Sequence, residues 1–394
     1  MAVAPNQARR DSPISRLLSR FKPNRKTRET KEQPQDYFDP RAPLKPSPLP
    51  LVLPEHQHIL SQLGWTIVTF PQPTAKPSSI TKSAAEPQAT LNPGSHPIQT
   101  AYEDLFRASA AFFDLPDEEK EKWKTRHGSE EGWSKIPGEK EFITLRTLAY
   151  TPDVLKGPAK RYWDLMGSHL DACLGRISST LDIPDGENEG LRRFVGPCKE
   201  MGDHEEQKTA TMLRLFRYEG WQEKIVAEPH ADLGLLSCVV GDVPGLEVWN
   251  GAQHIPIEKD YSTPCATLLG GRQLERLSNF RYPAGGHRVV AYGKSVGKGA
   301  AASQVSRKEP AKYRFSIVFV LRAHEDVMVD TDLLKTEITG PWREPIKDVT
   351  AGKLYAELRG AHFNINTGMK ERNEQRKRIE ERKRLGVKTG EGAN

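Results

Sequence analysis

The sequence predicts an α+β fold, mainly β, in which helices pack around an antiparallel sandwich or barrel. Three observations predict it. The chain has 394 residues, enough to bury a large core. Apolar residues recur at helical spacing in its first half, and from residue 211 to about residue 320 short apolar runs with a period near two alternate with turns. Helices followed by a block of strands indicate a sheet with helices packed against it.

The first half of the chain predicts a short helix and a strand within residues 58–70, and then two long helices. The first long helix follows a proline-rich loop over 71–97, and its apolar face carries Tyr102, Leu105, Phe106, Phe112 and Phe113. The second spans about 158–181 and repeats the pattern with Tyr162, Leu165, Met166, Cys173, Leu174, Ile177 and Leu181. Such faces are typical of helices that cover a core.

The second half predicts strands. Leucine-rich or β-branched runs stand at 212–218, 234–240, 245–249, 265–269, 287–292 and 313–320. Before the last run, residues 293–312 form an insertion rich in Gly, Ala and Lys. We expect a surface loop there, because the free-energy cost of closing a loop rises only slowly with its length. A mobile lid is the alternative interpretation of this insertion.

Composition and charge exclude several classes of protein. Hydrophobic residues make up 36% of the chain, and no apolar run approaches the roughly 18 residues of a membrane span, which excludes an integral membrane protein. Four scattered cysteines exclude a disulfide scaffold and a paired zinc site. The net charge of +6 belongs to the ends: residues 1–50 carry +6 and residues 370–394 carry +4, which leaves −4 elsewhere. We therefore expect no nucleic-acid partner for the folded body.

Both ends of the chain predict segments outside the core. Residues 1–54 predict a disordered basic, proline-rich arm that holds one short amphipathic helix, Ile14–Phe21. That helix is typical of a mitochondrial presequence, a membrane-surface contact or a solvated arm. From Lys370 a charged helix with almost no apolar stripe is predicted, either solvated or acting as a nuclear signal or RNA contact. Without a secretory segment after Met1, we expect an intracellular, cytoplasmic protein, and the basic ends leave mitochondrial and nuclear alternatives open.

A candidate metal site lies near the middle of the chain. His230 and Asp232 are two residues apart, so on a strand their side chains emerge from the same face. An imidazole nitrogen and a carboxylate oxygen side by side offer two adjacent metal ligands, and His287 on a later strand could supply the third. Two histidines and one carboxylate on one face form the ligand set of non-haem Fe(II) oxygenases. Taken alone the His-x-Asp pair says little, because a lone histidine is more often a hydrogen-bonded core residue.

A second polar pattern interrupts the last apolar strand. Arg314 and Ser316 share one face of this strand. An unpaired guanidinium inside a barrel would be costly, so its presence there indicates a bound carboxylate. The alternative is an arginine on an edge strand that faces water.

These segments resemble the isopenicillin N synthase-like 2-oxoglutarate/Fe(II) oxygenases. The resemblance covers most of residues 58–325 and keeps the expected order. Its pieces are FFDLPDEEK from 112, GEKE from 138, HADLGLL from 230, PGLEVW from 244, LERLSN from 274, RY from 281, HRVV from 287 and RFS from 314.

The resemblance implies a double-stranded β-helix, or jelly roll, braced by helices. It implies four parts, namely the arm over 1–54, a helical N-terminal region over 55–205, the β-helix core over 206–330 and a C-terminal helical extension with a charged tail over 331–394. The implied site residues are the catalytic Fe(II) ligands His230, Asp232 and His287, and the 2-oxoglutarate contacts Arg314, Ser316 and Tyr218. For Tyr218, a core aromatic on a strand is an equal alternative.

The implied function is a dioxygenase that uses Fe(II), 2-oxoglutarate and dioxygen to hydroxylate or desaturate a small organic substrate, with succinate and CO2 as co-products. One alternative is an oxidase of the isopenicillin N synthase type that needs no 2-oxoglutarate, in which Arg314 and Ser316 clamp the substrate's carboxylate. A non-catalytic binding protein and a nucleic-acid or histone demethylase are further alternatives, the last disfavoured by the acidic body. The partner we expect is a small-molecule substrate, and the oligomeric state stays open.

Three departures from the family pattern stand out. Arg272 occupies a position that is commonly acidic, and Phe280 replaces the usual glycine after Ser-Asn. Between His287 and Arg314 lie 26 residues, where about ten are usual in the family. Phe280, together with Trp133 and Phe142, could line an aromatic cavity or belong to the core.

Overall fold

The computed structural model describes residues 39–72, 95–126, 129–219, 223–293 and 312–390. The chain divides into two compact units, Met1–Arg41 and Ala42–Asn394. Only the last three residues of the first unit are described, and within them the Arg41 guanidinium binds the Asp39 carboxylate at 2.7 Å. The fold described below is that of the second unit.

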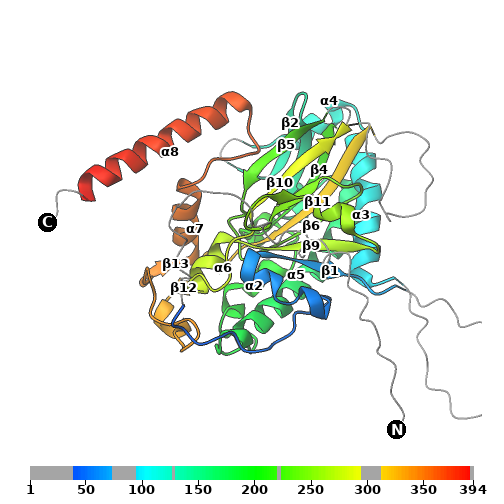
Figure 1. Ribbon diagram of the computed structural model, residues 1–394. Helices are drawn as coiled ribbons and strands as arrows, with labels where there is room; N and C mark the ends of the chain where they lie inside the picture. The colour runs from blue at the N-terminus through cyan, green and yellow to red at the C-terminus, as the bar shows by residue number, and fades with distance from the viewer. Residues whose placement is uncertain (1–38, 73–94, 127–128, 220–222, 294–311, 391–394) are drawn as a thin grey trace, which may run out of the picture. The chain divides into compact units, whose positions relative to one another are not determined.

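Two antiparallel sheets form the centre of this unit (Figure 1). The larger sheet has the strand order β1 (Trp65–Thr69), β9 (Cys265–Gly270), β6 (Leu236–Gly241), β11 (Tyr313–Leu321), β4 (Met212–Glu219), β3 (Lys140–Leu145) and β2 (Gly132–Ile136). The smaller sheet has the order β5 (Glu223–His230), β10 (His287–Tyr292), β7 (Leu246–Trp249) and β8 (His254–Ile255). Residues from both sheets line one cavity, so the sheets face each other as the two walls of a jelly roll.

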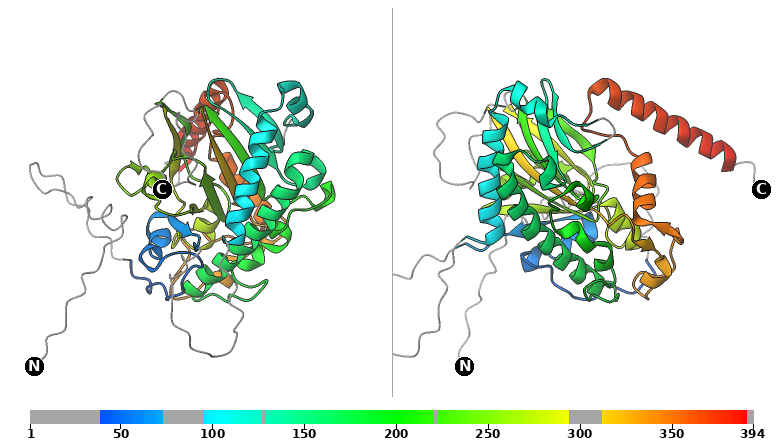
Figure 2. Two further views of the ribbon diagram at one scale, coloured as in Figure 1. Left: turned by 90° about the vertical axis from the view of Figure 1, so that its right-hand side faces the viewer. Right: turned by 180° about the vertical axis from the view of Figure 1, so that it is seen from behind.

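Two long helices cover the outer face of the larger sheet. They are α3 (Pro97–Phe113) and α5 (Asp153–Thr180), and Figure 2 shows them beside that sheet in the view from behind. On β11 the outward residue Phe319 packs edge-on against Trp163 of α5, with ring centroids 5.2 Å apart. The alternate residues of β11 point inwards and line the cavity, beginning with Ser316 and Val318. The strand therefore divides its side chains between the helical layer and the cavity.

The remaining helices and one further strand pair complete the fold. They are α2 (Ile59–Leu63), α4 (Asp117–Lys120), α6 (Arg272–Leu277), α7 (Ala351–Gly360), α8 (Met369–Gly390), several 3-10 turns and the two-stranded pair of β12 (Met328–Val329) and β13 (Val349–Thr350). Among the described residues, no helix is both long and apolar enough to cross a membrane.

The predicted fold class is confirmed, and each predicted strand run from 212 onwards corresponds to a strand. The sequence pattern missed β5 and the hairpin of β2 and β3. These two hairpin strands and β1 extend the larger sheet, so residues 55–205 supply more than helices. The predicted amphipathic helix Ile14–Phe21 and most of the insertion over 293–312 lie outside the described residues.

The charged C-terminal helix differs from a purely solvated one. Arg372, in the first turn of α8, is only 2% exposed. Its guanidinium binds Glu139 at 2.7 Å, beside β3, and Glu228 of β5 at 2.9 Å. Just before α8, the carbonyl of Ile365 accepts a hydrogen bond from Lys140 Nζ at 3.2 Å. Ionic contacts, which a search for an apolar stripe cannot detect, therefore hold the start of α8 against both sheets.

Candidate metal centre and cavity

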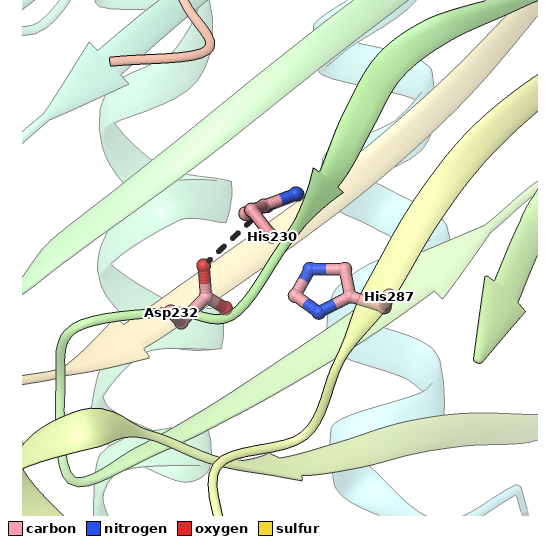
Figure 3. A group of neighbouring side chains, drawn as sticks. All are labelled: His230, Asp232 and His287. Atoms are coloured by element: carbon pink, nitrogen blue, oxygen red, sulfur yellow. Dashed lines mark ion pairs between the residues drawn. The ribbon is translucent and has the colours of Figure 1, made fainter. Parts of the chain in front are cut away.

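His230 and Asp232, which are close in the sequence, meet the distant His287 in the wall of the cavity (Figure 3). His230 is the last residue of β5, Asp232 follows in the next loop, and His287 begins β10. The two strands are antiparallel neighbours, and His230 pairs directly with His287. One potential ligand atom from each of the three residues lies within 4.8 Å of the others. Strand pairing therefore brings together the three residues that the sequence predicted as ligands.

Backbone carbonyl groups orient both imidazoles. The Nδ1 atom of His230 lies 2.7 Å from the Glu228 carbonyl oxygen, and the Nδ1 atom of His287 lies 3.0 Å from the Gly285 carbonyl oxygen. Because a carbonyl can only accept, each Nδ1 carries the proton and donates it. In the neutral form of each ring, Nε2 is then left with a free lone pair. Hydrogen bonds of this kind fix the tautomer and the ring orientation of a histidine that binds a metal.

The electrostatics of the three residues favour a cation between them. Burial, with help from neighbouring His287, lowers the pKa of His230 to about 3, so its ring is neutral near pH 7. Burial opposes ionisation of Asp232, but the nearby imidazoles, the Ser237 hydroxyl and, further away, Arg214 outweigh it and lower the pKa of that carboxyl. Its Oδ2 atom is buried and has no hydrogen-bond partner among the described residues. Two free imidazole nitrogens and a buried carboxylate oxygen without a partner fit a divalent metal ion.

The cavity beside this cluster has a volume of about 870 Å³. That volume is in the range of natural small-molecule sites. Apolar side chains such as Phe216, Val239 and Val318 line much of its wall. The C-terminal extension also contributes, with Tyr355 of α7 and Phe363 of the following loop. The cavity can therefore hold a small organic molecule next to the three converging side chains.

Arg314 lies at the base of the jelly roll and is already paired. The side chain is 3% exposed, and its Nη2 atom lies 3.0 Å from both carboxylate oxygens of the buried Glu258. Its Nε atom donates to the Val243 carbonyl at 3.0 Å. The same Glu258 accepts the backbone N–H groups of Gly245 and Leu246 at 2.7 and 2.8 Å. The carboxylate that the sequence argument required for this guanidinium is thus one of the chain's own.

The backbone is shaped to receive this arginine. A Cβ atom at Gly241 or Gly245 would lie 2.5 or 2.4 Å from a side-chain nitrogen of Arg314, so only glycine leaves room. One polar atom of the arginine, Nη1, is buried without a partner among the described residues, and so is the Ser316 hydroxyl oxygen. Arg314 does not line the cavity, whereas Ser316 and Tyr218 do. The role of Arg314 towards 2-oxoglutarate stays a prediction.

Tyr218 lies across the strand pair from Arg314. The two residues are register partners on β4 and β11, and the guanidinium carbon is 5.6 Å from the centre of the tyrosine ring. Burial raises the pKa of Tyr218 to about 12, so the phenol keeps its proton and can donate a hydrogen bond. A polar group at the cavity wall is therefore available beside Ser316.

The sequence missed several polar residues at or near the cavity, and it named aromatic ones that do not line it. Glu258 and the cavity-lining Arg214 carry no motif that marks them as site residues. Arg214 could have been found only from the alternation of residues along β4. Glu258 could have been found only as an acidic residue shortly before Tyr261. The three aromatics proposed for an aromatic-lined cavity are not among the described lining residues: Trp133, Phe142 and Phe280.

Phe280 instead accounts for one departure from the family pattern. Its backbone has φ +62°, in the left-handed region that glycine adopts most easily. The usual glycine at this position is thus replaced by a residue that keeps the same turn at some cost in strain.

Comparisons with known proteins agree on the fold. No protein-family model matches the sequence, and a search of curated proteins finds no match. Among solved structures, a full-length Neurospora crassa protein in complex with alpha-KG and 5-formyluracil is similar, with a TM-score of 0.52 and 19% identity over 76% of this chain and 87% of that chain. JOX2 in complex with 2OG, Fe and JA gives a TM-score of 0.52 at 16% identity, over 81% and 83% of the two chains.

A third structure comes from Caulobacter crescentus and is described as a 2OG-Fe(II) oxygenase family protein. It gives a TM-score of 0.50 at 19% identity, over 77% of this chain and 92% of that chain. Identities this low establish the fold alone. The chain has the jelly-roll fold of the 2-oxoglutarate/Fe(II) oxygenase structures that it matches.

Proposed function

We propose that this protein is a non-haem Fe(II) and 2-oxoglutarate-dependent dioxygenase that oxidises a small organic substrate. The observation that carries the proposal is the convergence of His230, Asp232 and His287 in the wall of an 870 Å³ cavity. Two neutral imidazoles and one carboxylate on one face are the ligand set of this enzyme class. The matched structures support it, because the Neurospora crassa protein and JOX2 were solved with alpha-KG or 2OG.

In this proposal the Nε2 atoms of His230 and His287 and the carboxylate of Asp232 hold Fe(II). When bound, Fe(II) with 2-oxoglutarate supplies the activation of dioxygen for oxidation of a C–H bond, with succinate and CO2 as co-products. The protein's part is positioning. The backbone carbonyls of Glu228 and Gly285 keep both rings aimed at one point, and the apolar wall excludes bulk water from the reacting atoms.

We assign the distal carboxylate of 2-oxoglutarate to the region of Arg314, Ser316 and Tyr218. The buried Nη1 atom of Arg314 and the Ser316 hydroxyl both lack partners among the described residues, and a carboxylate would satisfy both. Tyr218 is protonated and lies on the same wall. Glu258 already balances the charge of Arg314, so a second carboxylate must either share the guanidinium or displace it from Glu258.

The ion pair of Arg314 with Glu258 also favours a second candidate function. An oxidase of the same fold that needs no 2-oxoglutarate would leave the Arg314–Glu258 pair intact as a structural ion pair. The substrate itself would then occupy the cavity beside the metal ligands, and no succinate would form.

Turnover separates the two candidates. The full-length protein, reconstituted with Fe(II) in air, is incubated with 2-oxoglutarate, and succinate is measured by mass spectrometry while dioxygen is followed with an electrode. We expect succinate to form in step with dioxygen uptake, and Asp232→Ala to abolish both. Dioxygen uptake without succinate would favour the second candidate. Absence of both activities in the parent protein would contradict the 2-oxoglutarate-dependent function.

A further inference from the structure

Arg214 is a buried guanidinium that reaches the cavity from β4. The side chain belongs to the inward-facing row of that strand, between Met212 and Phe216, and it lines the cavity. It is 8% exposed. Such burial is costly for a charged group unless a partner compensates it.

The described part of the chain gives Arg214 only partial compensation. Its Nε atom donates to the Thr144 hydroxyl at 2.7 Å, and the guanidinium carbon lies 5.5 Å from the ring centre of Phe142. Neither terminal nitrogen has a hydrogen-bond partner among the described residues, and no described carboxylate forms an ion pair with it. Burial accordingly lowers the pKa of Arg214. Thr144 and Phe142 thus hold the guanidinium of this cavity-lining residue and leave its two terminal nitrogens for another partner.

Two other buried arginines differ from Arg214 because each has a carboxylate partner. Arg322, also on the cavity wall, binds the Glu130 carboxylate at 2.6 Å. Arg314 binds Glu258 at 3.0 Å. In both cases burial lowers the arginine pKa and the partner carboxylate more than restores it. Since Glu130 is committed to Arg322, Arg214 is the buried cavity arginine whose charge is left for a ligand, within the residues that the structure describes.

The charged residues that line the cavity also favour an anionic ligand. The described lining residues include five arginines, Arg214, Arg272, Arg322, Arg359 and Arg378, and two acids, Glu130 and Asp232. Asp232 belongs to the metal cluster, and Glu130 is paired. The cavity is therefore electropositive and attracts an anion.

We propose that Arg214 binds the carboxylate of the primary substrate, which makes that substrate a small carboxylic acid with an apolar body. This inference rests on the proposed function and names its substrate class. Two free terminal nitrogens in one plane match the two oxygens of a carboxylate. Met212, Phe216 and Val318 line the same cavity and suit an apolar body, and the charge of Arg214 reaches Asp232 of the metal cluster.

Arg214 and the Arg314 region are separate anchoring points. Arg214 pairs with Val318 across β4 and β11, whereas Arg314 pairs with Tyr218. Four residues along a strand correspond to about 13 Å. The co-substrate and the substrate therefore have distinct cationic anchors along the same wall.

Binding to the metal-free, full-length protein tests this inference without any turnover. The probes are benzoate and hexanoate, each matched with its neutral amide, measured by ligand-observed NMR and calorimetry. We expect the parent to bind the acids more tightly than the amides, and Arg214→Gln to weaken acid binding about tenfold or more. Arg214→Lys, which keeps the charge but loses the planar fork, falls between the two. Thermal unfolding of each variant establishes that it is folded.

Arg378→Gln is the matched control, because Arg378 lines the cavity but is exposed. We expect it to weaken acid binding much less than Arg214→Gln does, because solvent screens its exposed charge. Equal weakening by Arg378→Gln and Arg214→Gln, or no weakening by Arg214→Gln, would overturn the proposal. A loss of 2-oxoglutarate binding in Arg214→Gln as large as the loss of benzoate binding would also overturn it, since Arg214 would then be the co-substrate anchor. Failure of the parent to bind Fe(II) would contradict the proposed function, whereas the benzoate comparison decides the role of Arg214 by itself.

Discussion

Two regions of the molecule, the metal cluster and the surroundings of Arg314, treat buried charge in opposite ways. In the metal region, Asp232 keeps a buried oxygen without a partner among the described residues, and the nearby imidazoles turn their Nδ1 atoms to backbone carbonyls. In the Arg314 region, the guanidinium is bound to both oxygens of Glu258. An unsatisfied buried charge is costly unless a ligand supplies the missing partner. The metal region is therefore prepared for a ligand, whereas the Arg314 region carries its own counter-charge.

The largest loss of stability should come from breaking the buried ion pair of Arg314 and Glu258. Arg314→Met leaves Glu258 buried without its cation, and we expect the free energy of unfolding to fall by about 3–5 kcal/mol. Arg214→Met is the control, because it leaves no buried carboxylate behind, and we expect a loss of no more than about 1 kcal/mol. Urea denaturation at pH 7 measures both. Equal losses would mean that the two buried arginines do not differ as described.

The metal region should respond more weakly. Asp232→Asn removes a carboxylate that the nearby imidazoles favour but that has one buried oxygen without a hydrogen-bond partner among the described residues, so the metal-free protein should lose less stability than Arg314→Met does. Fe(II) affinity should fall about 100-fold, or roughly 2.7 kcal/mol, because a carboxylate ligand is lost. Anaerobic calorimetry gives the affinity, and thermal unfolding with a chelator gives the stability. A metal-free variant destabilised as much as Arg314→Met would show that Asp232 is a structural residue.

Glu258→Gln tests whether the Arg314 region, once it loses its counter-charge, becomes ready for a ligand as the metal region is. The amide can still accept the backbone N–H groups of Gly245 and Leu246 but no longer neutralises Arg314. The freed guanidinium should then bind the distal carboxylate of 2-oxoglutarate about tenfold more tightly. Calorimetry with a redox-inert metal in place of Fe(II) measures it. An unchanged affinity would mean that 2-oxoglutarate does not reach Arg314.

The smallest effect concerns pH and the pair of Arg322 with Glu130. Burial raises the pKa of Glu130, but the charge and hydrogen bonds of Arg322 outweigh it and hold the pKa at about 2, below the ordinary 4.5. A carboxyl with a lowered pKa in the folded state stabilises above its ordinary pKa, and the contribution is lost as pH falls towards the folded value. The parent should thus exceed Glu130→Gln in stability above pH 4.5.

The difference between these two proteins should shrink between about pH 4.5 and pH 2. Urea denaturation at pH 7, 4.5 and 3 follows it. A difference that stays constant down to pH 3 would show that the Glu130 carboxylate is not held by a charge interaction.

The sequence predicted those parts of the fold that follow from local periodicity. The runs at 287–292 and 313–320 are rich in β-branched and aromatic residues, and they became β10 and β11. By contrast, β5 contains Glu223, Lys224, Glu228 and Pro229, and its burial pattern is mixed, so alternation could not reveal it. Its position depends on pairing with β10, which is a tertiary effect.

The candidate site also contains residues that the sequence predicts and residues that it does not. His230, Asp232 and His287 were found because spacing on strands and a known ligand set constrain them together. The partner of Arg314 could not be found, because Glu258 is 56 residues away and lies in a 3-10 turn that no motif marks. Strand alternation places a side chain on a face, but only the folded packing decides which buried charges are paired.

The most direct test of the central claim is an anaerobic titration of the full-length protein with Fe(II) and then 2-oxoglutarate, followed by visible absorbance. The account predicts a weak metal-to-ligand band that saturates at one equivalent of each and is absent in His230→Ala. A parent protein that shows no band, or a variant indistinguishable from the parent, would contradict it.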